Sequence, residues 1–259
     1  IAVTVTDEKT LRVLDNYARK KAKMGKIHVK IDTGMHRAGL LPSEALKFIP
    51  KIEQYKNIYL EGVFTHFAAS DEKDLAFTNF QNQVFKETLR KLHARGVSAP
   101  MVHAANSGAV LRLPESYYNL VRPGIIIYGL SPTGTTSAAE FIYPFVPKPI
   151  LSWKTKIIQI RTIEKGESVG YGRKFTAQKQ TRVGLLPVGY ADGFRRSPNW
   201  EFVLVKGKKS SILGRVSMDQ TSINITDIHN ANVGDEVVLI GEQGKERITA
   251  AEVAERLGT

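Results

Sequence analysis

Polar side chains follow predicted strands at four places in the first half of the sequence: Arg37, His66, the pair Asn106 and Ser107, and Arg122. In parallel-stranded barrels, the loops after several strands converge and form the active site. Each residue also has a structural interpretation, since a lone histidine at a strand end is more often structural and an arginine before a proline is usually a surface ion-pair partner. The occurrence of all four at the same end of the predicted sheet indicates a shared site.

The last two predicted strand ends offer groups suited to an anion. Ser107 follows one of them, and the backbone of Gly124 and Ile125 follows the other. Backbone N–H groups near a helix start favour an anion, and a glycine lets the main chain approach it closely. Barrels of this kind often bind phosphate at their last two strand ends, so the sequence predicts a phosphate site here.

The elements that must position these residues are strands alternating with helices. Strands are predicted in IAVTVT at the N-terminus, KIHVKID, NIYLEGVFTH, MVHAAN and NLVRPGIIIYG. Helices are predicted after Thr6 or Asp7, at about 43–52, on a long stripe that includes Phe77 and Phe80 and stops at Gly96, and at about 107–112. Repeated strand–helix units indicate a parallel sheet, and roughly five of them fit part of a (β/α)8 TIM barrel. We expect the first three units of the barrel upstream of Ile1.

The second half of the sequence has a different pattern of predicted secondary structure. Short β-rich runs follow the linker-like SPTGTTSAAE: LSWKTKIIQI, RVGLLPVG, EFVLVKG, SSILG, TSINIT and DEVVLIG. Gly, Pro and Asn separate these runs at the spacing of an all-β domain. A last helix is predicted with a Thr249–Glu252 capping box and Gly258 at its end. We therefore expect a barrel part at residues 1–135 and a C-terminal β domain at residues 136–259.

Composition narrows the possible functions. The chain has 259 residues and no cysteine, which excludes disulfides, thiolate metal sites and cysteine nucleophiles and favours a cytoplasmic location. The formal net charge is +12, but the lysines are scattered and no DNA-binding motif accompanies them, so no nucleic-acid partner is expected. The apolar runs are too short to span a bilayer, so no membrane partner is expected. No metal site is expected either.

Seven segments are distinctive when taken in order: VKIDTGMHRAG (29–39), THFA (65–68), AANSGA (104–109), VRPGIIIYG (121–129), VGYGRKF (169–175), VGYADGF (188–194) and GRVSMDQ (214–220). Together they resemble the alanine racemase family across nearly the whole chain. The resemblance implies a pyridoxal 5'-phosphate (PLP) enzyme with a barrel and a β domain, acting as a head-to-tail homodimer. It also implies that two bases interconvert L-alanine and D-alanine, which supplies D-alanine for peptidoglycan.

The resemblance assigns the cofactor to the strand ends. Arg122 would donate to the pyridine nitrogen of PLP, and a guanidinium, which has no acceptor, disfavours a protonated ring nitrogen. The ring is then a weaker electron sink, which favours return of the proton over transamination. Ser107 would hold the phosphate with the backbone of Gly124 and Ile125, and Asn106 would lie beside it.

Tyr171 resembles one of the two catalytic bases and would reach into the partner subunit's barrel. A phenol of reference pKa about 10 is a poor base at neutral pH unless cationic neighbours stabilise its phenolate. His66 and Arg122 resemble the residues of that network. Without the resemblance, Tyr171 would be interpreted as a turn tyrosine between Gly170 and Gly172.

Other residues resemble substrate-site positions. Arg37 would contact the phenolic oxygen of PLP and the substrate carboxylate region, and Met218 would offer its backbone N–H to that carboxylate. Lys30 aligns with a lysine that many family members carry N-carboxylated, and an unmodified Lys30 is the open alternative. The substrate's access corridor would include four residues that also fit ordinary turn or interface roles: Tyr190, Arg196, Arg215 and Asp219.

The sequence departs from the family pattern in two respects. The motif that supplies the PLP-carrying lysine at the end of the first barrel strand is not found in these 259 residues. A C-terminal tyrosine of the phosphate and substrate site is not found either. Because one base and the covalent anchor are missing, we expect the chain to be inactive alone.

Several alternatives are distinguishable in part. Amino-acid decarboxylases of the same fold pair the pyridine nitrogen with a carboxylate and use a cysteine, whereas this chain has Arg122 and no cysteine. Single-barrel PLP-binding proteins lack a β domain. A non-catalytic PLP-binding relative is less favoured because Tyr171 and His66 are retained. A serine racemase, or another amino-acid racemase of the family, stays open because its distinguishing regions would lie elsewhere.

Overall fold

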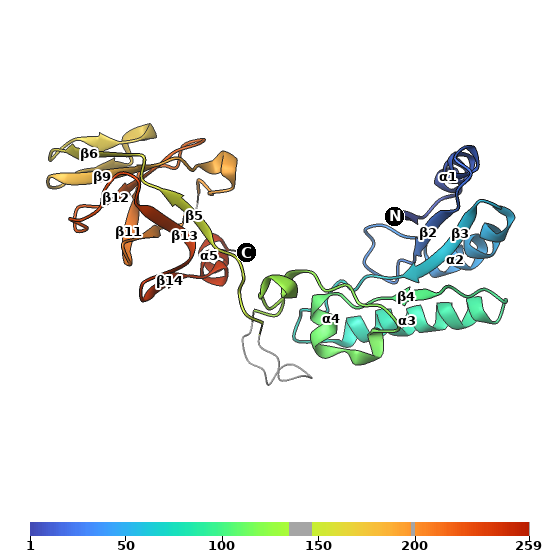
Figure 1. Ribbon diagram of the computed structural model, residues 1–259. Helices are drawn as coiled ribbons and strands as arrows, with labels where there is room; N and C mark the ends of the chain where they lie inside the picture. Colours follow the sequence, from blue (N-terminus) through green and yellow to red (C-terminus); the bar gives the residue numbers. More distant parts are fainter. Residues whose placement is uncertain (135–146, 198–199, 259) are drawn as a thin grey trace. The chain divides into compact units, whose positions relative to one another are not determined.

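The chain forms two compact units, residues 1–148 and 149–259. The computed structural model describes residues 1–134, 147–197 and 200–258 (Figure 1). The predicted domain boundary at 135/136 therefore lies outside the described residues. Each unit has its own hydrophobic core.

A four-stranded parallel sheet, in the order β1-β2-β3-β4, forms the base of the first unit. Its strands are β1 (Ala2–Val5), β2 (Gly25–Lys30), β3 (Ile58–Phe64) and β4 (Met101–His103). The helices of this unit are α1 (Glu8–Lys20), α2 (Pro42–Phe48), α3 (Ala76–His93) and α4 (Ser107–Arg112). Sequential parallel strands joined by helices are the arrangement of a (β/α)8 segment, as predicted.

The two faces of this sheet differ chemically because side chains alternate along a strand. Three apolar side chains of β2 and the residue after it are fully buried in the core formed with the helices: Ile27, Val29 and Ile31. The residues between them point the other way and define what we call the polar face: Lys26, His28 and Lys30. The alternation predicted for KIHVKID is confirmed.

Two predicted elements differ from the structure. NLVRPGIIIYG forms no regular strand: Leu120 makes a single parallel bridge to His103, and Ile125–Tyr128 is a 3-10 helix, η3. Proline cannot donate to a sheet ladder, so Pro123 ends the pairing. The helix expected at 43–52 becomes a 3-10 helix, η1 (Ile49–Gln54), at Pro50, which lacks an amide hydrogen.

The apolar stripe predicted for α3 is wrong at its start. Phe77 and Phe80 are 44% and 57% exposed, although their rings stack on each other with centroids 6.0 Å apart. The buried face of the helix instead includes Gln81, Phe85 and Leu92. Gln81 is buried because its amide serves as a hydrogen-bond partner for the loop after β3.

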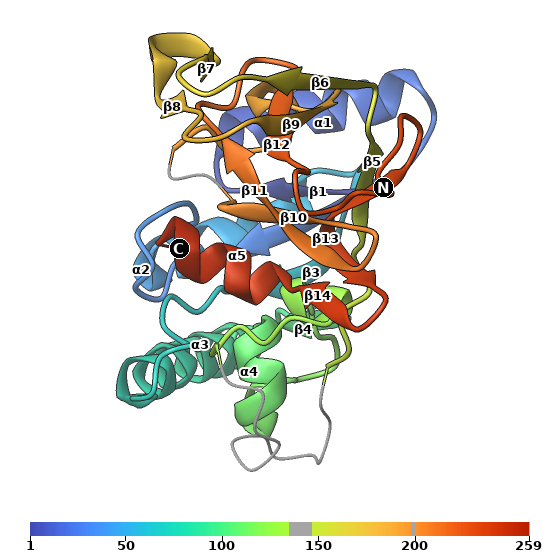
Figure 2. The same ribbon diagram turned by 90° about the vertical axis from the view of Figure 1, so that its left-hand side faces the viewer.

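The second unit is an antiparallel β domain. Its main sheet has the order β14-β13-β10-β11-β12-β9-β6, with β5 paired to β13, and Figure 2 shows these strands following one another in the view. The strands are β5 (Trp153–Lys156), β6 (Gln159–Ile163), β9 (Thr181–Leu186), β10 (Phe202–Val205), β11 (Lys208–Leu213), β12 (Thr221–Asn224), β13 (Glu236–Gln243) and β14 (Glu246–Ile248). A separate small pair consists of β7 (Ser168–Val169) and β8 (Phe175–Thr176).

An aromatic cluster and a capped helix complete this unit. The rings of Phe194 and Trp200 lie 4.7 Å apart, and both meet Trp153 edge-on. The helix α5 (Ala250–Leu257) begins with the predicted capping box, in which the Thr249 hydroxyl and the Glu252 carboxylate each accept a backbone N–H of the other residue. Gly258, at φ 70°, ends the helix in a left-handed conformation as predicted.

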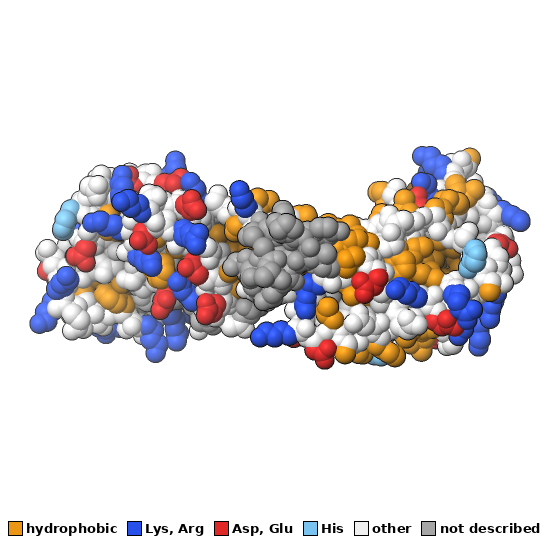
Figure 3. All heavy atoms as spheres, turned by 90° about the horizontal axis from the view of Figure 1, so that it is seen from below, with side chains coloured by type: hydrophobic (Ala, Val, Ile, Leu, Met, Phe, Trp, Pro, Cys, Tyr) orange, Lys and Arg blue, Asp and Glu red, His pale blue; other side chains and the backbone are white. Residues whose placement is uncertain are grey.

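The surface carries charges of both signs. Lys and Arg side chains alternate with Asp and Glu on the face shown in Figure 3. Several of them form exposed ion pairs, such as Lys154 with Glu236 at 3.0 Å. Within the described residues, no helix is long and apolar enough to cross a membrane.

Candidate active site

Arg122 is the centre of a polar cluster at the strand ends of the first unit. Its Nη2 donates to the carbonyl oxygens of Thr65 at 2.7 Å and Ala104 at 3.0 Å. Its Nη1 donates to Nδ1 of His103 in a short hydrogen bond, and Nη2 lies 3.3 Å from Nδ1 of His66. Burial lowers the pKa of Arg122 to about 10, so the guanidinium stays charged at neutral pH. These four acceptors fix its plane.

His66 is a neutral imidazole at neutral pH. Burial, followed by the positive charges of Arg122, Lys30 and Arg37, lowers the pKa of His66 to about 4. Because arginine can only donate, the Nδ1 of His66 that faces Arg122 accepts, and the proton of the ring resides on Nε2. His66 is therefore a donor on its Nε2 side.

Three cationic side chains of this cluster lack a carboxylate partner. Lys30 is only 7% exposed, and burial, with the charges of Arg37 and Arg122, lowers the pKa of its ammonium. In the part of the chain that the structure describes, no ion pair joins any of the three to Asp or Glu. The negative charge of Asp32 raises the pKa of Lys30, but Asp32 Oδ1 already accepts hydrogen bonds from two backbone N–H groups. Such uncompensated positive charge favours an anionic ligand.

Ser107 and the segment after Pro123 lie side by side. The backbone N–H of Gly124 donates to Ser107 Oγ at 2.8 Å, and that of Ile126 to the same oxygen at 3.5 Å. Since the oxygen accepts, the hydroxyl hydrogen of Ser107 is left to donate. The backbone N–H of Ile125 has no acceptor among the described residues. The hydroxyl and this amide together offer an anion two donors.

Asn106 supports Ser107 from the start of α4. Its Oδ1 accepts the N–H of Ala109 at 3.2 Å and the hydroxyl of Ser70 at 2.6 Å, and its Nδ2 donates to the carbonyl of Phe67 at 3.5 Å. The amide of Asn106 is thus occupied within the protein. We conclude that it positions the Ser107 turn.

The donor set of this cluster fits PLP. Arg122 offers a guanidinium with donors only, and neither its Nε nor the second hydrogen of Nη1 has an acceptor among the described residues. Ser107 and the N–H of Ile125 offer donors to a phosphate. The cations at positions 37 and 122 match a ligand that carries a phosphate and a phenolic oxygen.

Tyr171 lies on an exposed turn of the second unit, at the start of a 3-10 helix between β7 and β8, η5 (Tyr171–Arg173). The glycines on either side, Gly170 and Gly172, both have φ 70°, which other residues rarely adopt. The Tyr171 side chain is 68% exposed, and its hydroxyl makes no hydrogen bond within the described residues. Arg215 lies beside the turn, with Nη1 3.7 Å from the position that a Cβ on Gly172 would occupy.

Met218 and Tyr190 lie on two neighbouring turns of the same unit. Backbone hydrogen bonds of 3.0 and 2.8 Å join the turn of Tyr190 to the turn of Met218. The Met218 side chain is 58% exposed and Asp219 after it is also exposed. The Arg196 guanidinium lies 5.8 Å from the centroid of the Tyr190 ring. That Tyr171 approaches His66 and Arg122 of a partner subunit stays a prediction.

Comparison with known proteins identifies the family. The profile described as alanine racemase, N-terminal domain, matches residues 1–132, and the profile described as alanine racemase, C-terminal domain, matches residues 150–259. This chain belongs to the alanine racemase family. It is 41% identical over 257 residues to alanine racemase from Halothermothrix orenii, covering 99% of this chain and 66% of that protein. The chain thus spans about two thirds of the length of such relatives.

Solved structures of the family have the same fold. Alanine racemase from Bacillus anthracis with bound L-Ala-P superimposes with a TM-score of 0.87 at 36% identity, over 100% of this chain and 66% of that one. Histidine racemase from Leuconostoc mesenteroides gives a TM-score of 0.86 at 27% identity, over 100% of this chain and 68% of that one. The two names differ in the amino acid, so the fold alone leaves the substrate open.

Sequence reasoning missed one residue of this alanine racemase-type cluster, His103. Its side chain is 4% exposed, and burial, with the charges of Arg122 and His28, lowers its pKa to about 3. A signal was available in the sequence. His103 is a polar residue in an apolar strand, and it follows the same alternation that places His28 on the polar face.

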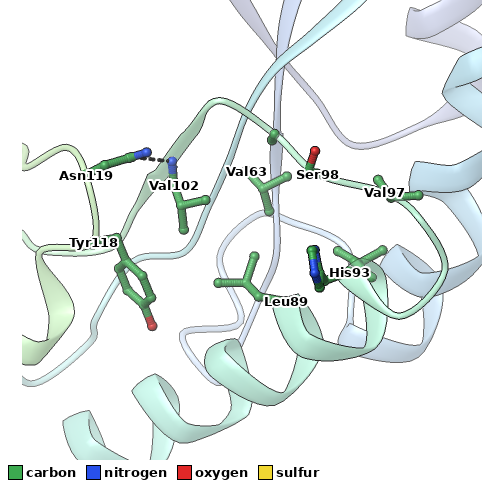
Figure 4. A pocket seen from close by; sticks show the side chains of 10 residues that line it. Val63, Leu89, His93, Val97, Ser98, Val102, Tyr118 and Asn119 are labelled. Atoms are coloured by element: carbon green, nitrogen blue, oxygen red, sulfur yellow. Dashed lines mark hydrogen bonds between the residues drawn. The ribbon is translucent and has the colours of Figure 1, made fainter.

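An apolar cavity of about 340 Å³ in this unit lies apart from the cluster (Figure 4). It is lined by Leu89 of α3, Tyr118, and two strand residues, Val63 and Val102. These valines directly precede Phe64 and His103, so alternation turns them to the helix side of the sheet. The polar cluster around Arg122 therefore lies on the opposite face of the sheet from this cavity.

Proposed function

We propose that the full-length protein containing these residues is a PLP-dependent alanine racemase that interconverts L-alanine and D-alanine. The observation that carries the proposal is the Arg122 guanidinium, held between two neutral imidazoles and two carbonyl oxygens. A donor-only group in this position suits an unprotonated pyridine nitrogen. PLP, when bound, withdraws electrons from the substrate and makes its Cα proton acidic.

The residues of the first unit would bind the cofactor and orient it and the substrate. Ser107 and the N–H of Ile125 would hold the phosphate, and Gly124 gives the main chain room to approach. Arg122 would face the ring nitrogen, while Arg37 would face the phenolic oxygen and the substrate carboxylate. The half-buried, fixed geometry of Arg122 supports this division, because its four acceptors all belong to the protein.

Lys30 would be N-carboxylated in this enzyme. The neutral amine and CO2 form a carbamate with the release of one proton, so a lowered pKa of Lys30 favours the reaction. The product would replace a buried cation by an anion beside Arg37 and remove their repulsion. A carbon-13 resonance at the carbamate position, seen in protein exposed to 13C-bicarbonate and absent from Lys30→Met protein, would test this step.

Tyr171 would be the base on the L-alanine side, with its phenol oxygen taking up or returning the proton. Cationic neighbours are needed to stabilise its phenolate, and Arg122, linked to neutral His66, would supply that charge from the partner subunit's barrel. The high exposure of Tyr171 and Met218 supports a head-to-tail homodimer, in which a partner would cover both. Met218 would donate its backbone N–H to the substrate carboxylate. Tyr190, Arg196, Arg215 and Asp219 would line the access corridor.

The motif that would supply the cofactor's lysine, which would also be the second base, is not found in these 259 residues. We propose that residues 1–259 alone do not racemise alanine, and that the complete protein does. The D-alanine formed would serve peptidoglycan synthesis.

Two other substrates compete with alanine. Serine is a substrate that the sequence resemblance leaves open, and a histidine racemase shares the fold. The deciding experiment is racemisation of L-alanine, L-serine and L-histidine by the full-length protein with PLP, followed by chiral chromatography. We expect the highest kcat/KM for alanine. A higher value for serine or histidine would reassign the substrate, and no racemisation of any of them would overturn the proposed function.

A further inference from the structure

A chain of hydrogen bonds runs across the polar face from Arg122 to a surface carboxylate. Arg122 Nη1 contacts His103 Nδ1, and His103 Nε2 lies 2.8 Å from His28 Nδ1. His28 Nε2 lies 3.4 Å from Glu61 Oε2. Glu61 Oε1 in turn accepts a hydrogen bond from Lys26 at 2.7 Å.

The chemistry of the two ends fixes every proton between them. A guanidinium can only donate, so His103 Nδ1 accepts and its proton is on Nε2. His103 then donates to His28 Nδ1, which leaves the His28 proton on Nε2, directed at Glu61. Glu61 can only accept when ionised, and the hydrogen bond from Lys26 lowers its pKa. No other assignment satisfies all three contacts, because a doubly protonated ring would set a donor against a donor.

We propose that His103, His28 and Glu61 form a one-directional relay that positions the Arg122 guanidinium. Each group donates toward the next, so the negative end at Glu61 polarises the two imidazoles and strengthens the acceptor at His103 Nδ1. His103, His28 and Glu61 are positioning residues, since they would act on the cofactor only through Arg122. The expected effect of the relay on catalysis rests on the proposed function. The positions of the protons on His103 and His28 do not depend on it.

The sheet is built to hold this relay. The Phe64 ring stacks on His103 with centroids 4.8 Å apart and a 10° angle between planes, and it also lies 5.2 Å from the Arg122 guanidinium carbon. A Cβ at Gly62 would come within 2.5 Å of the His28 ring. Glycine inside a strand is unfavourable, so its presence here marks a close approach. Gly62 gives His28 the space it occupies.

The strand register brings Glu61 to the relay. Ile27 pairs with Leu60 and His28 with Gly62, so β3 has one extra residue, Glu61, between these pairs. The extra residue of a β-bulge is left unpaired in the ladder of hydrogen bonds, and its side chain often points in a new direction. The Glu61 side chain is 14% exposed, and this is where the relay reaches the surface.

Neutron diffraction from deuterium-exchanged crystals of the full-length protein tests the protons directly. We expect deuterium on Nε2 and none on Nδ1 in both His103 and His28. Deuterium on Nδ1 of either ring overturns the relay, whether or not the protein is a racemase. The expected protons in a protein without racemase activity would leave the relay standing and overturn the proposed function instead.

Variants of the full-length protein test the coupling. Glu61→Leu removes the terminal acceptor, and we expect kcat to fall roughly five-fold, the equivalent of about one hydrogen bond, with a KM for alanine that changes little. Glu61→Gln keeps an acceptor oxygen and should restore most of kcat. Glu87→Gln, which removes a surface carboxylate outside the relay, is the matched control. Equal kcat in Glu61→Leu and Glu87→Gln would overturn the coupling.

Gly62→Ala tests the geometry from the other side. The added methyl group would displace the His28 ring and break its contact with His103. Should this variant not fold, His28→Phe removes the same acceptor without altering the strand backbone. In either variant we expect the Nε2–H of His103 to exchange faster with solvent in nitrogen-15 NMR of the full-length protein. An unchanged exchange rate in both would overturn the relay.

Discussion

The strand ends of the first unit and the turns of the second unit carry the proposed chemistry in different ways. Around Arg122 the side chains of His66 and His103 are partly or fully buried and already hydrogen-bonded to the guanidinium, which has four acceptors in all. Tyr171 and Met218 are 68% and 58% exposed, and Tyr171 has no hydrogen-bond partner among the described residues. The first region is organised within one chain, whereas the second would be organised by a partner subunit. Substitutions in the two regions should therefore differ in their effects on stability and on activity.

The largest effect is expected at Tyr171. In the full-length protein, Tyr171→Phe should reduce racemisation by about a hundred- to ten-thousand-fold, the usual contribution of a general base. The fold should survive because the hydroxyl has no partner among the residues that the structure describes. In deuterated water, exchange at Cα of D-alanine should persist through the lysine base, while exchange at Cα of L-alanine should nearly disappear. Equal loss for both enantiomers would indicate a structural role instead.

Arg122→Glu should produce the next largest effect. A carboxylate would accept a hydrogen bond from a protonated ring nitrogen and so strengthen the electron sink. Racemisation should therefore fall by roughly a hundred-fold, and transamination should appear as pyruvate. Unlike Tyr171→Phe, this variant should also lower the thermal midpoint, because buried carbonyl groups lose their donor. Arg161→Glu, at an exposed arginine of β6, is the control. Normal turnover without pyruvate would separate Arg122 from the ring.

Acid should destabilise the first region through His66 and His103. The pKa values of His66 and His103 are lowered to about 4 and about 3, whereas an unfolded chain has histidine near 6.5. The unfolded state therefore binds more protons between these values. The stabilisation is complete above about pH 6.5 and is lost as the pH falls toward 4 and then 3.

The measurement is the thermal midpoint of the full-length protein from pH 7.5 to pH 4.5. His66→Gln should flatten its decline, whereas His229→Gln, at an exposed histidine of the second unit, should leave the slope unchanged. Parallel curves for His66→Gln and the unaltered protein would contradict the assignment of a half-buried, neutral His66.

The smallest effect is expected at the end of the second unit. Thr249→Ala removes the cap of α5 and should lower the free energy of unfolding by about 1 kcal/mol. Thr249→Ser keeps the hydroxyl and should retain most of the stability. Neither change should alter kcat, because the cap contacts no proposed site residue. A loss of activity in Thr249→Ser would show that α5 takes part in the site.

Much of the fold could be predicted because local signals suffice for it. Period-two alternation located β2, and the Thr249–Glu252 capping box located α5. Prediction failed where one residue overrides a pattern. Pro123 stops the strand expected at NLVRPG, and Pro50 changes the helix type at η1. The Phe77 and Phe80 stripe failed because periodicity does not say which face is covered.

The candidate site was predictable to a lesser extent. His66 and Ser107 follow β3 and β4, and that position could be read from the sequence, whereas the strand predicted around Arg122 is only a single bridge at Leu120. The relay could not be read in the same way, since His28 and His103 are 75 residues apart and meet only through the sheet register. The role of Glu61 depends on a register shift that no local sequence pattern predicts.

That register shift also determines where the chain can change length. In any regular stretch of β2 or β3, inserting or deleting one residue would exchange the apolar and polar faces and expose Ile27 or Val29 in place of a site residue. At Glu61, β3 already has one residue more than the paired stretch of β2. A deletion there therefore leaves Leu60 opposite Ile27 and Gly62 opposite His28. This single position can be lost without disturbing the core. Among homologous proteins, one-residue gaps in these strands should therefore accumulate at position 61, and each protein with such a gap should lack the surface end of the relay.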